Sequence, residues 1–284
     1  MVNKSVCVNC LQFDMNKVVK NNQLSKPTWL SKENYVRNFI EKQPLKLRAP
    51  SSFNVEMKLE LGNKFSGKKI LYWATNEKTS KSPLIEQPKK AYGNFENSAV
   101  VKASAIGNAV LRFNCPQLYR AKETEQSKLS TFFRHLHFVV EKEGKWDSQV
   151  YTKIVICKYK FKKFIEESKS GMTVLLNALP CEYFAKDHIP NSFNLFYKTI
   201  AKMSVKDLEN WFSEVIKIHY PKLATQIKNK RLEIYEIPII VYCAHEKCNA
   251  SELAIKELMK KGFVNLHEYN GGINEYRKMI PVDR

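Results

Sequence analysis

The sequence predicts two folded modules, an all-β sandwich followed by an α/β domain with a parallel sheet, and two changes along the chain carry this prediction. Residues 51–164 contain short alternating strands separated by turn residues, which is typical of a sandwich. From residue 165 to residue 284 apolar strands alternate with helical stretches, as in a parallel α/β sheet. Residues 1–50 are polar and basic, and we expect an N-terminal arm there.

The charge balance changes at the same boundary. Of the 47 basic and 28 acidic residues, residues 1–50 hold 9 and 3 (net +6), residues 51–164 hold 21 and 10 (net +11), and residues 165–284 hold 17 and 15 (net +2). A surface of this kind attracts an acidic protein or another polyanion with strong salt dependence, and we expect such a partner for residues 1–164. A solvated, Lys-rich surface is the alternative, since no nucleic-acid-binding motif accompanies the charge.

Composition excludes several classes of protein. The longest apolar run, Ile237–Ala244, has eight residues, whereas a membrane-spanning helix needs about 20. The first residues lack the apolar core of a secretory signal. Seven scattered cysteines argue against a disulfide scaffold and favour a reducing compartment, so we expect an intracellular, cytoplasmic protein. Cys7 and Cys10 form one CxxC without a second pair at zinc spacing, and are expected to be free thiols.

Local patterns place the elements. The expected β-strands of the first module are Phe53–Leu61, Ala99–Val101, Ala109–Phe113, Leu136–Glu141 and Val150–Lys160, and a helix is expected at Asn34–Lys42. The strict alternation of Lys158–Lys162 predicts an edge strand of the sandwich, where lysines discourage aggregation. The second module is expected to contain strands at Val174–Leu176, Ile237–Tyr242 and Phe263–Glu268, with helices at Val205–Ile218 and Ala250–Lys261.

One cysteine of the second module stands where a nucleophile is expected. Cys243 directly follows a buried strand, and a short polar loop then leads into a helix. Backbone N–H groups at the helix start and the helix dipole would lower the pKa of this thiol. A thiolate held in this way is a nucleophile that can carry a persulfide. A buried structural cysteine is the other interpretation of the same pattern.

Three ordered segments around Cys243 resemble the rhodanese-like domain. They are VLLNALPCEYFAKDHIPNSFN at 174–194, the strand and loop ending in CAHEKC at 243–248, and KGFVNLHEYNGGI at 261–273. The resemblance implies a sulfurtransferase in which Cys243 is the catalytic cysteine. It further implies that the loop residues Ala244, His245, Glu246, Lys247 and Cys248 surround the sulfur, with a small-molecule sulfur donor and acceptor.

Two features depart from the rhodanese-like pattern. Asn177 and Leu179 replace an Asp-x-Arg of the first motif, and Cys248 stands where the loop often ends in Arg or Lys. Three roles for Cys248 follow: it resolves a persulfide on Cys243, forms a redox pair with it, or is structural.

The middle module contains a His-x-His. On a strand, His135 and His137 lie on one face, so both imidazoles could reach one metal ion, although a chance pair is equally compatible with the pattern. The segments around Trp73, Tyr92, Gly107–Phe113 and Pro116–Tyr119, followed by His135-Leu-His-Phe138, resemble the intradiol ring-cleavage dioxygenases. That family binds ferric iron with two tyrosines and two histidines.

Carried onto this sequence, the dioxygenase resemblance implies Fe(III) bound by Tyr92, Tyr119, His135 and His137, with Tyr72 as the rival of Tyr92. The spacings between these residues are shorter than in the family, and Arg134 adjoins His135. We therefore expect trimmed substrate loops.

The sequence thus predicts a rhodanese-like sulfurtransferase that uses a Cys243 persulfide, fused to a diverged dioxygenase-like sandwich. Two alternatives stay open. One is a non-catalytic structural or interaction protein, conceivably a component of a large-virus particle, because the Lys and Asn bias is what an AT-rich genome produces. The other is an iron-dependent dioxygenase.

Overall fold

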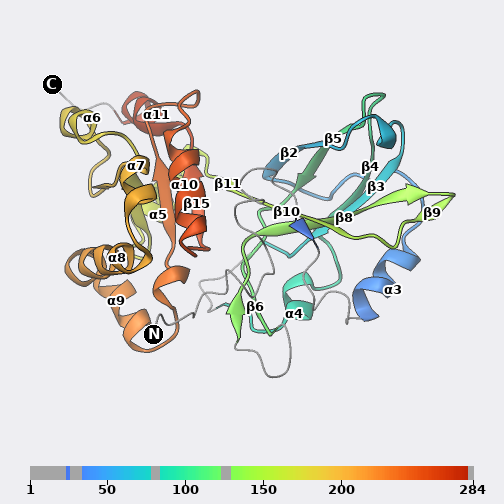
Figure 1. Cartoon of the computed structure of the whole chain (residues 1–284), viewed down its shortest axis with the longest axis horizontal. Coiled ribbons are helices and arrows are strands. Elements are labelled where there is room, and N and C mark those ends of the chain that lie inside the picture. Colours follow the sequence, from blue (N-terminus) through green and yellow to red (C-terminus); the bar gives the residue numbers. More distant parts are fainter. Residues whose placement is uncertain (1–23, 26–33, 78–83, 123–128, 281–284) are drawn as a thin grey trace. The chain divides into compact units, whose positions relative to one another are not determined.

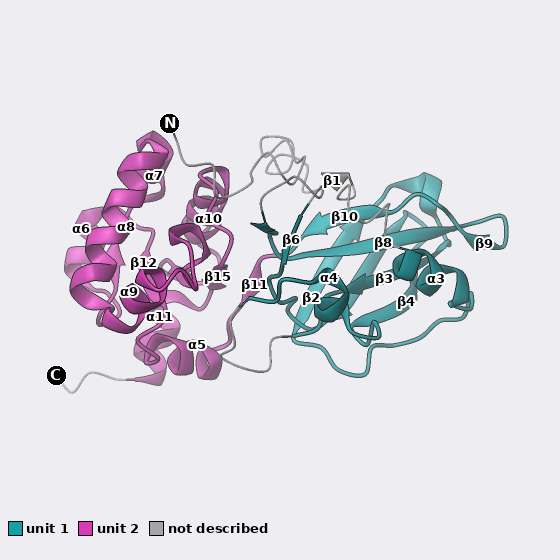
Figure 2. Ribbon diagram, turned by 90° about the horizontal axis from the view of Figure 1, so that it is seen from below, with its two compact units in different colours: residues 1–155 teal, residues 156–284 magenta. Residues whose placement is uncertain are grey.

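The chain folds into two compact units, residues 1–155 and 156–284, shown in separate colours in Figure 2. The structure is a computed structural model that describes residues 24–25, 34–77, 84–122 and 129–280. Most of the predicted N-terminal arm, including Cys7 and Cys10, lies outside these residues. No helix in the described part of the chain is long and apolar enough to span a membrane.

The first unit contains antiparallel sheets, as predicted. Its main sheet has the order β1-β10-β8-β3-β4, comprising β1 (Leu24–Ser25), β10 (Tyr151–Ile154), β8 (His135–Lys142), β3 (Lys69–Ala74) and β4 (Ser98–Lys102). The remaining strands pair as β9 (Lys145–Trp146) with β8, β2 (Val55–Glu60) with β5 (Asn108–Phe113), and β6 (Arg120–Ala121) with β7 (Ser130–Thr131). The helices are α3 (Asn34–Lys42), the single turn η1 (Asn63–Phe65) and α4 (Pro88–Tyr92).

The centre of this sheet is a strand that sequence analysis did not predict. Strand β3, KILYWA, pairs with β4 on one side and β8 on the other, and five of its six residues are buried. A strand buried on both faces loses the apolar–polar alternation that identifies a half-buried strand. Strand β3 lies next to the His-x-His of β8, because Trp73 pairs with His137.

The second unit is built on one parallel sheet. Its order is β11-β15-β14-β12-β13, comprising β11 (Cys157–Lys158), β15 (Leu266–Tyr269), β14 (Ile239–Tyr242), β12 (Val174–Asn177) and β13 (Phe193–Asn194). The helices are α5 (Phe161–Ser168), α6 (Cys181–Lys186), α7 (Tyr197–Lys202), α8 (Val205–His219), α9 (Pro221–Lys228), η2 (Ile234–Glu236), α10 (Ala250–Lys260) and α11 (Gly272–Met279).

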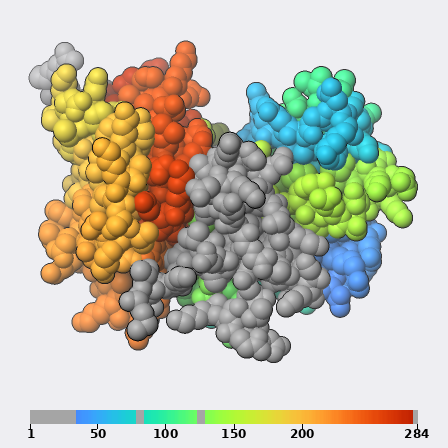
Figure 3. Space-filling model, in the orientation of Figure 1, coloured from blue at the N-terminus to red at the C-terminus, as the bar shows by residue number. Residues whose placement is uncertain are grey.

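Helices cover both faces of this parallel sheet. Helix α10 packs on β14 and β15, with α7 beside it. Helices α5 and α11 lie on the opposite face, as Figures 1 and 2 show. Helices α7, α8 and α10, coloured from yellow to orange-red, form the face of this unit that is visible in Figure 3. This arrangement leaves the carboxyl ends of the parallel strands at one edge, where loops gather.

The predicted edge strand at Lys158–Lys162 is wrong in its extent and in its sheet. Only Cys157–Lys158 are extended, and they pair in parallel with β15 of the second unit. Helix α5 begins at Phe161 and buries Phe164. An alternation of five residues is too short to separate a strand period from a helical one, and the spacing of Phe161 and Phe164 suits the helix.

Replacing Phe164 with alanine is expected to destabilise the second unit by about 3–5 kcal/mol, the usual cost of removing a buried phenyl ring. Phe164 is fully buried and stacks on Tyr269 with ring centroids 3.9 Å apart. Urea unfolding followed by circular dichroism measures the loss. Tyr183→Ala is the matched control, because that aromatic residue is 56% exposed; equal midpoints for the two variants would contradict the packing described.

Candidate functional site

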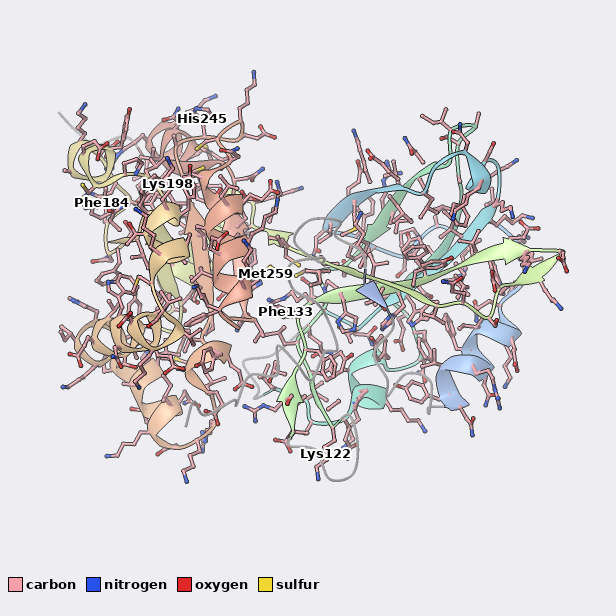
Figure 4. All side chains as sticks on the ribbon, viewed as in Figure 1. Lys122, Phe133, Phe184, Lys198, His245 and Met259 are labelled. Atoms are coloured by element: carbon pink, nitrogen blue, oxygen red, sulfur yellow. The ribbon has the colours of Figure 1, made fainter. Side chains whose placement is uncertain are left out.

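Cys243 lies at the carboxyl end of β14, at the edge of the sheet where loops gather. Its side chain is fully buried. Residues 245–247 of the following loop are exposed, and α10 begins at Ala250. Figure 4 labels His245, which lies in this loop at the upper end of the second unit. The strand, loop and helix order predicted from the sequence is confirmed, and so is the position of Cys243 between them.

The glycine pair of the third motif holds this loop in place. The backbone N–H groups of Ile273 and Asn274 donate to the carbonyl oxygens of Cys243 and Ala244, each at 3.0 Å. Gly272 has φ +62°, and a Cβ at this residue would lie 2.4 Å from the Cys243 carbonyl oxygen. Only glycine permits so close an approach in this conformation, so α11 determines where the Cys243 backbone lies.

The first motif braces the strand before the cysteine. The Tyr242 hydroxyl accepts from the Ile189 backbone N–H at 3.0 Å and pairs with the Ser192 hydroxyl at 2.7 Å. At the neighbouring strand end, the Asn177 side-chain oxygen accepts from the Leu179 backbone N–H at 2.9 Å. Asn177 therefore caps the turn after β12 in the place of the aspartate expected from the motif.

A polar chain that sequence analysis missed lies behind Cys243. The Cys243 sulfur is 3.3 Å from the Ser251 hydroxyl oxygen, and this hydroxyl donates to Glu268 at 2.7 Å. Lys158 forms an ion pair with the same carboxylate at 3.1 Å. Ser251 and Glu268 are both buried. The sequence did contain a signal for this chain: Glu268 is an acidic residue in a strand that was predicted to belong to the sheet. A buried carboxylate needs polar partners.

The two loop cysteines differ in acidity, and the pKa of Cys243 is raised where the sequence predicted that it is lowered. Burial raises the pKa of the Cys243 thiol, and a hydrogen bond to Cys248 raises it further, despite hydrogen bonds from Ser251. Burial also opposes ionisation of Cys248, but hydrogen bonds from Cys243 and from the backbone N–H groups of Ala250 and Ala244 outweigh it and lower the pKa of Cys248. The helix-start N–H of Ala250 therefore acts on Cys248, which is also less buried, whereas that of Ser251 acts on Cys243.

Other cysteines differ in state. Cys181, Cys243 and Cys248 are free thiols. Cys115 and Cys157 are disulfide-bonded.

Alkylation should therefore modify Cys248 before Cys243 as the pH rises. The thiolate is the reactive form, and the lower pKa and greater exposure of Cys248 both favour it. Labelling with iodoacetamide at several pH values, followed by peptide mass spectrometry, gives a rate for each cysteine. Cys181, which is exposed, is the internal reference, and denatured protein should lose the difference. Faster labelling of Cys243 would contradict the hydrogen-bond arrangement described.

The four residues predicted as iron ligands come together in the first unit. The Tyr92 hydroxyl is 3.2 Å from His135 Nε2 and 2.9 Å from His137 Nε2, and the Tyr119 hydroxyl is 3.0 Å from His135 Nε2. His135 and His137 are on β8, Tyr92 ends α4, and Tyr119 immediately precedes β6. All four side chains are buried. Two phenol oxygens and two imidazole nitrogens thus face one another.

The second nitrogen of each imidazole is occupied. His135 Nδ1 donates to the Phe133 carbonyl oxygen at 2.6 Å, and His137 Nδ1 is hydrogen-bonded to the Thr152 hydroxyl at 2.8 Å. Figure 4 labels Phe133. Metal-ligating histidines are oriented in this way in proteins. Burial lowers the pKa of His135 to about 4 and that of His137 well below its usual value, so both rings are neutral and have the form that binds metal.

Tyr72, the rival of Tyr92, does not join this cluster. Its hydroxyl donates to the Arg112 carbonyl oxygen at 2.7 Å and accepts from the Arg112 N–H at 3.1 Å. Burial raises the pKa of Tyr92 well above its usual value, so a metal ion would have to displace the phenol proton. Within the described residues no group of three or more His, Cys, Asp or Glu side chains is suited to a metal ion; the cluster has two such side chains and two tyrosines. Its donor set fits a ferric ion, for which phenolate oxygen is a hard anionic ligand.

Comparison with known proteins identifies the second unit. Residues 160–279 match the family model described as Rhodanese-like domain. No curated protein sequence matches the chain. The C-terminal part of the chain therefore contains a Rhodanese-like domain with an α/β fold and a parallel sheet, as predicted. The match leaves residues 51–159 outside, and the dioxygenase resemblance of the middle region stays an expectation.

Solved structures similar to the chain include the following three. An uncharacterized protein from Saccharomyces cerevisiae has 22% identity and a TM-score of 0.32, covering 44% of this chain and 93% of that one. The human single-domain sulfurtransferase TSTD1 has 16% identity and a TM-score of 0.31, covering 43% and 95%. The Saccharomyces cerevisiae single-domain sulfurtransferase RDL2 has 16% identity and a TM-score of 0.32, covering 45% and 94%.

Proposed function

We propose that the C-terminal unit is a sulfurtransferase that carries sulfane sulfur as a persulfide on Cys243. The observation that carries this proposal is the position of Cys243, directly after β14, in a loop whose backbone is held by the N-terminal N–H groups of α11. The family match of residues 160–279 supports the same class of reaction.

The loop geometry suggests how the reaction begins. Cys243 must lose its proton to become a nucleophile, and the side chain of Cys248 in the same loop interacts with it. Cys248 is thus placed to take that proton. The Cys243 thiolate then attacks the outer sulfur of the donor, the donor's inner group leaves with the bonding electrons, and Cys243 keeps the sulfur. A nucleophilic acceptor takes the sulfur and restores the thiolate.

Thiosulfate with cyanide as acceptor tests the proposal, with thiocyanate formation as the readout. A sulfur atom added to the peptide that contains Cys243, seen by mass spectrometry before cyanide is added, is the expected intermediate. The Cys181→Ser variant should behave as the unmodified protein, since Cys181 lies on α6 and not in the loop. Failure of thiosulfate and of an organic persulfide to load Cys243 would end the sulfurtransferase proposal.

We also propose that the first unit binds ferric iron through Tyr92, Tyr119, His135 and His137. The specific observation is the convergence of these four buried side chains, whose phenol and imidazole groups are linked by three contacts of 2.9, 3.0 and 3.2 Å. Bound iron would supply charge-transfer colour and a Lewis acid for a catecholate, as in the dioxygenases that this region resembles. The residues themselves hold two neutral imidazoles in fixed orientations and exclude water from the cluster.

Metal analysis and a visible absorption spectrum of the purified full-length protein test the second proposal. Expected results are iron at a stoichiometry of one and a tyrosinate-to-iron band. A colourless protein that takes up no iron on reconstitution would leave the cluster as a buried polar network, and an interaction role would become the better account of the first unit.

A further inference from the structure

The strongest unassigned feature is the pair of thiols in the loop between β14 and α10. Cys243 and Cys248 are both free, and their side chains interact in the loop. A loop turn brings Cys248 back toward the strand end, because its backbone N–H donates to the His245 carbonyl oxygen at 2.8 Å. The Cys243 sulfur also lies 3.3 Å from the Cys248 carbonyl oxygen. The two sulfurs are therefore neighbours in one loop.

The surroundings of the two sulfurs differ. Two backbone N–H groups, from Ala244 and Ala250, donate to the Cys248 sulfur. The Cys243 sulfur receives one, from Ser251, and otherwise lies next to oxygens: the carbonyls of His245 at 3.9 Å and Cys248 at 3.3 Å, and the Ser251 hydroxyl. A sulfur beside oxygens is a hydrogen-bond donor, whereas a sulfur that receives N–H groups is stabilised as the anion.

The chain behind Cys243 reinforces this difference. The single proton of the Ser251 hydroxyl is donated to Glu268 at 2.7 Å, so the hydroxyl oxygen is available to accept from the Cys243 thiol. Lys158 neutralises the buried carboxylate at 3.1 Å. These contacts favour the thiol form of Cys243 and favour ionisation of Cys248, which lies on the side of the loop that is partly exposed.

We propose that Cys248 resolves the persulfide that the proposed function places on Cys243, so that the domain releases hydrosulfide and forms a Cys243–Cys248 disulfide. As the Cys248 sulfur attacks the inner sulfur of the Cys243 persulfide, the proton that Cys248 took from Cys243 passes to the outer sulfur. A sulfur–sulfur bond forms between the two cysteines, and the bond to the outer sulfur breaks. The outer sulfur leaves with the electron pair as hydrosulfide.

The electrons of this step balance within the site. The sulfane sulfur is reduced by two electrons to hydrosulfide, and the two cysteine thiols are oxidised to one disulfide. A second turnover then needs an external dithiol reductant, which exchanges with the exposed side of the disulfide. The inferred substrate class is a sulfane sulfur donor together with a dithiol, rather than a donor together with a sulfur-accepting nucleophile.

The inference rests on the proposed function, and the experiment separates the two. Reduced, desalted full-length protein is treated with one equivalent of thiosulfate or an organic persulfide without reductant. Hydrosulfide is measured, and the thiol state is read by intact-mass and peptide mass spectrometry. The protein is expected to release one hydrosulfide per chain, to become two hydrogens lighter, and to yield a peptide pair crosslinked between Cys243 and Cys248.

Cys248→Ser is the decisive variant. It is expected to keep the added sulfur on Cys243 and to release no hydrosulfide, while Cys181→Ser is expected to match the unmodified protein. Peptide mapping of the unmodified protein needs no variant, so a folding defect in Cys248→Ser would not remove the test.

The outcomes are distinct. If the unmodified protein keeps a stable persulfide on Cys243 and shows no crosslinked peptide, the resolving role of Cys248 is overturned while the sulfurtransferase proposal stands. If neither the unmodified protein nor Cys248→Ser takes up sulfur, both proposals are overturned. If Cys248→Ser releases as much hydrosulfide as the unmodified protein, the resolving thiol is not Cys248.

Discussion

Replacing Cys243 with serine is expected to reduce thiocyanate formation from thiosulfate and cyanide by about 10³-fold or more, the scale seen when a covalent nucleophile is removed. A serine hydroxyl cannot form a persulfide, and its much higher pKa leaves it protonated in the loop. The same variant should show no added sulfur on the peptide that contains residue 243. Steady-state turnover and peptide mass spectrometry measure the two losses.

Ser251→Ala provides the matched comparison for that substitution. It removes the hydroxyl that lies 3.3 Å from the Cys243 sulfur and leaves Cys243 itself unchanged. This variant should still load sulfur, with an altered pH profile, because the partner of the thiol is lost. Undiminished turnover of Cys243→Ser, with Ser251→Ala also active, would mean that another group carries the sulfur.

Replacing His137 with alanine is expected to abolish iron binding by the first unit. His137 contributes one of four donors, and its ring is held at both nitrogens, by Tyr92 and by Thr152. Alterations even beyond the ligands commonly cost metal sites about 10–100-fold in affinity, and loss of a ligand should cost more. Iron content after reconstitution and dialysis, together with the visible band, measures the effect.

Conservative tyrosine variants identify the anionic ligands. Tyr119→Phe and Tyr92→Phe each keep the ring but remove the oxygen, and each should shift or abolish the charge-transfer band. Tyr72→Phe is the control, because its hydroxyl hydrogen-bonds to Arg112 rather than to a histidine. A band that persists in Tyr92→Phe and disappears in Tyr72→Phe would show that Tyr72, and not Tyr92, is the ligand.

Motif order was the most informative part of the sequence for the second unit. The strand before Cys243, the helix after it and the glycine pair near the end of the chain were all located from residues alone. The structure gives the reason for the glycine pair, since a Cβ on Gly272 would collide with the Cys243 carbonyl oxygen. A local requirement of this kind restricts which residue can stand at a given position of a motif, so the sequence shows it.

In the first unit, strands β2, β4, β5 and β8 lie at the predicted positions, although among them only β2 and β5 alternate in burial. Sequence analysis missed β3, which is buried on both faces and does not alternate. It also extended the last strand into residues that form α5. Period two is visible only where one face of a strand meets water, so the central strand of a sheet is the one that pattern analysis identifies least well. The acidic partner predicted for residues 1–164 and the dioxygenase resemblance of residues 51–164 stay predictions.

The sequence by itself determined the order of the two units, the Rhodanese-like domain, predicted at residues 165–284 and matched at residues 160–279, and the location of Cys243 after a buried strand. Only the tertiary structure decided which thiol ionises first, because that depends on N–H groups of Ala244 and Ala250 and on Glu268 of another strand reaching the loop. It also decided between Tyr72 and Tyr92, since the two differ in where their hydroxyls point. The spacing of residues in a motif reflects contacts between neighbours in the sequence. The pKa of a thiol and the set of ligands at a metal site depend instead on atoms that folding brings together from distant parts of the chain.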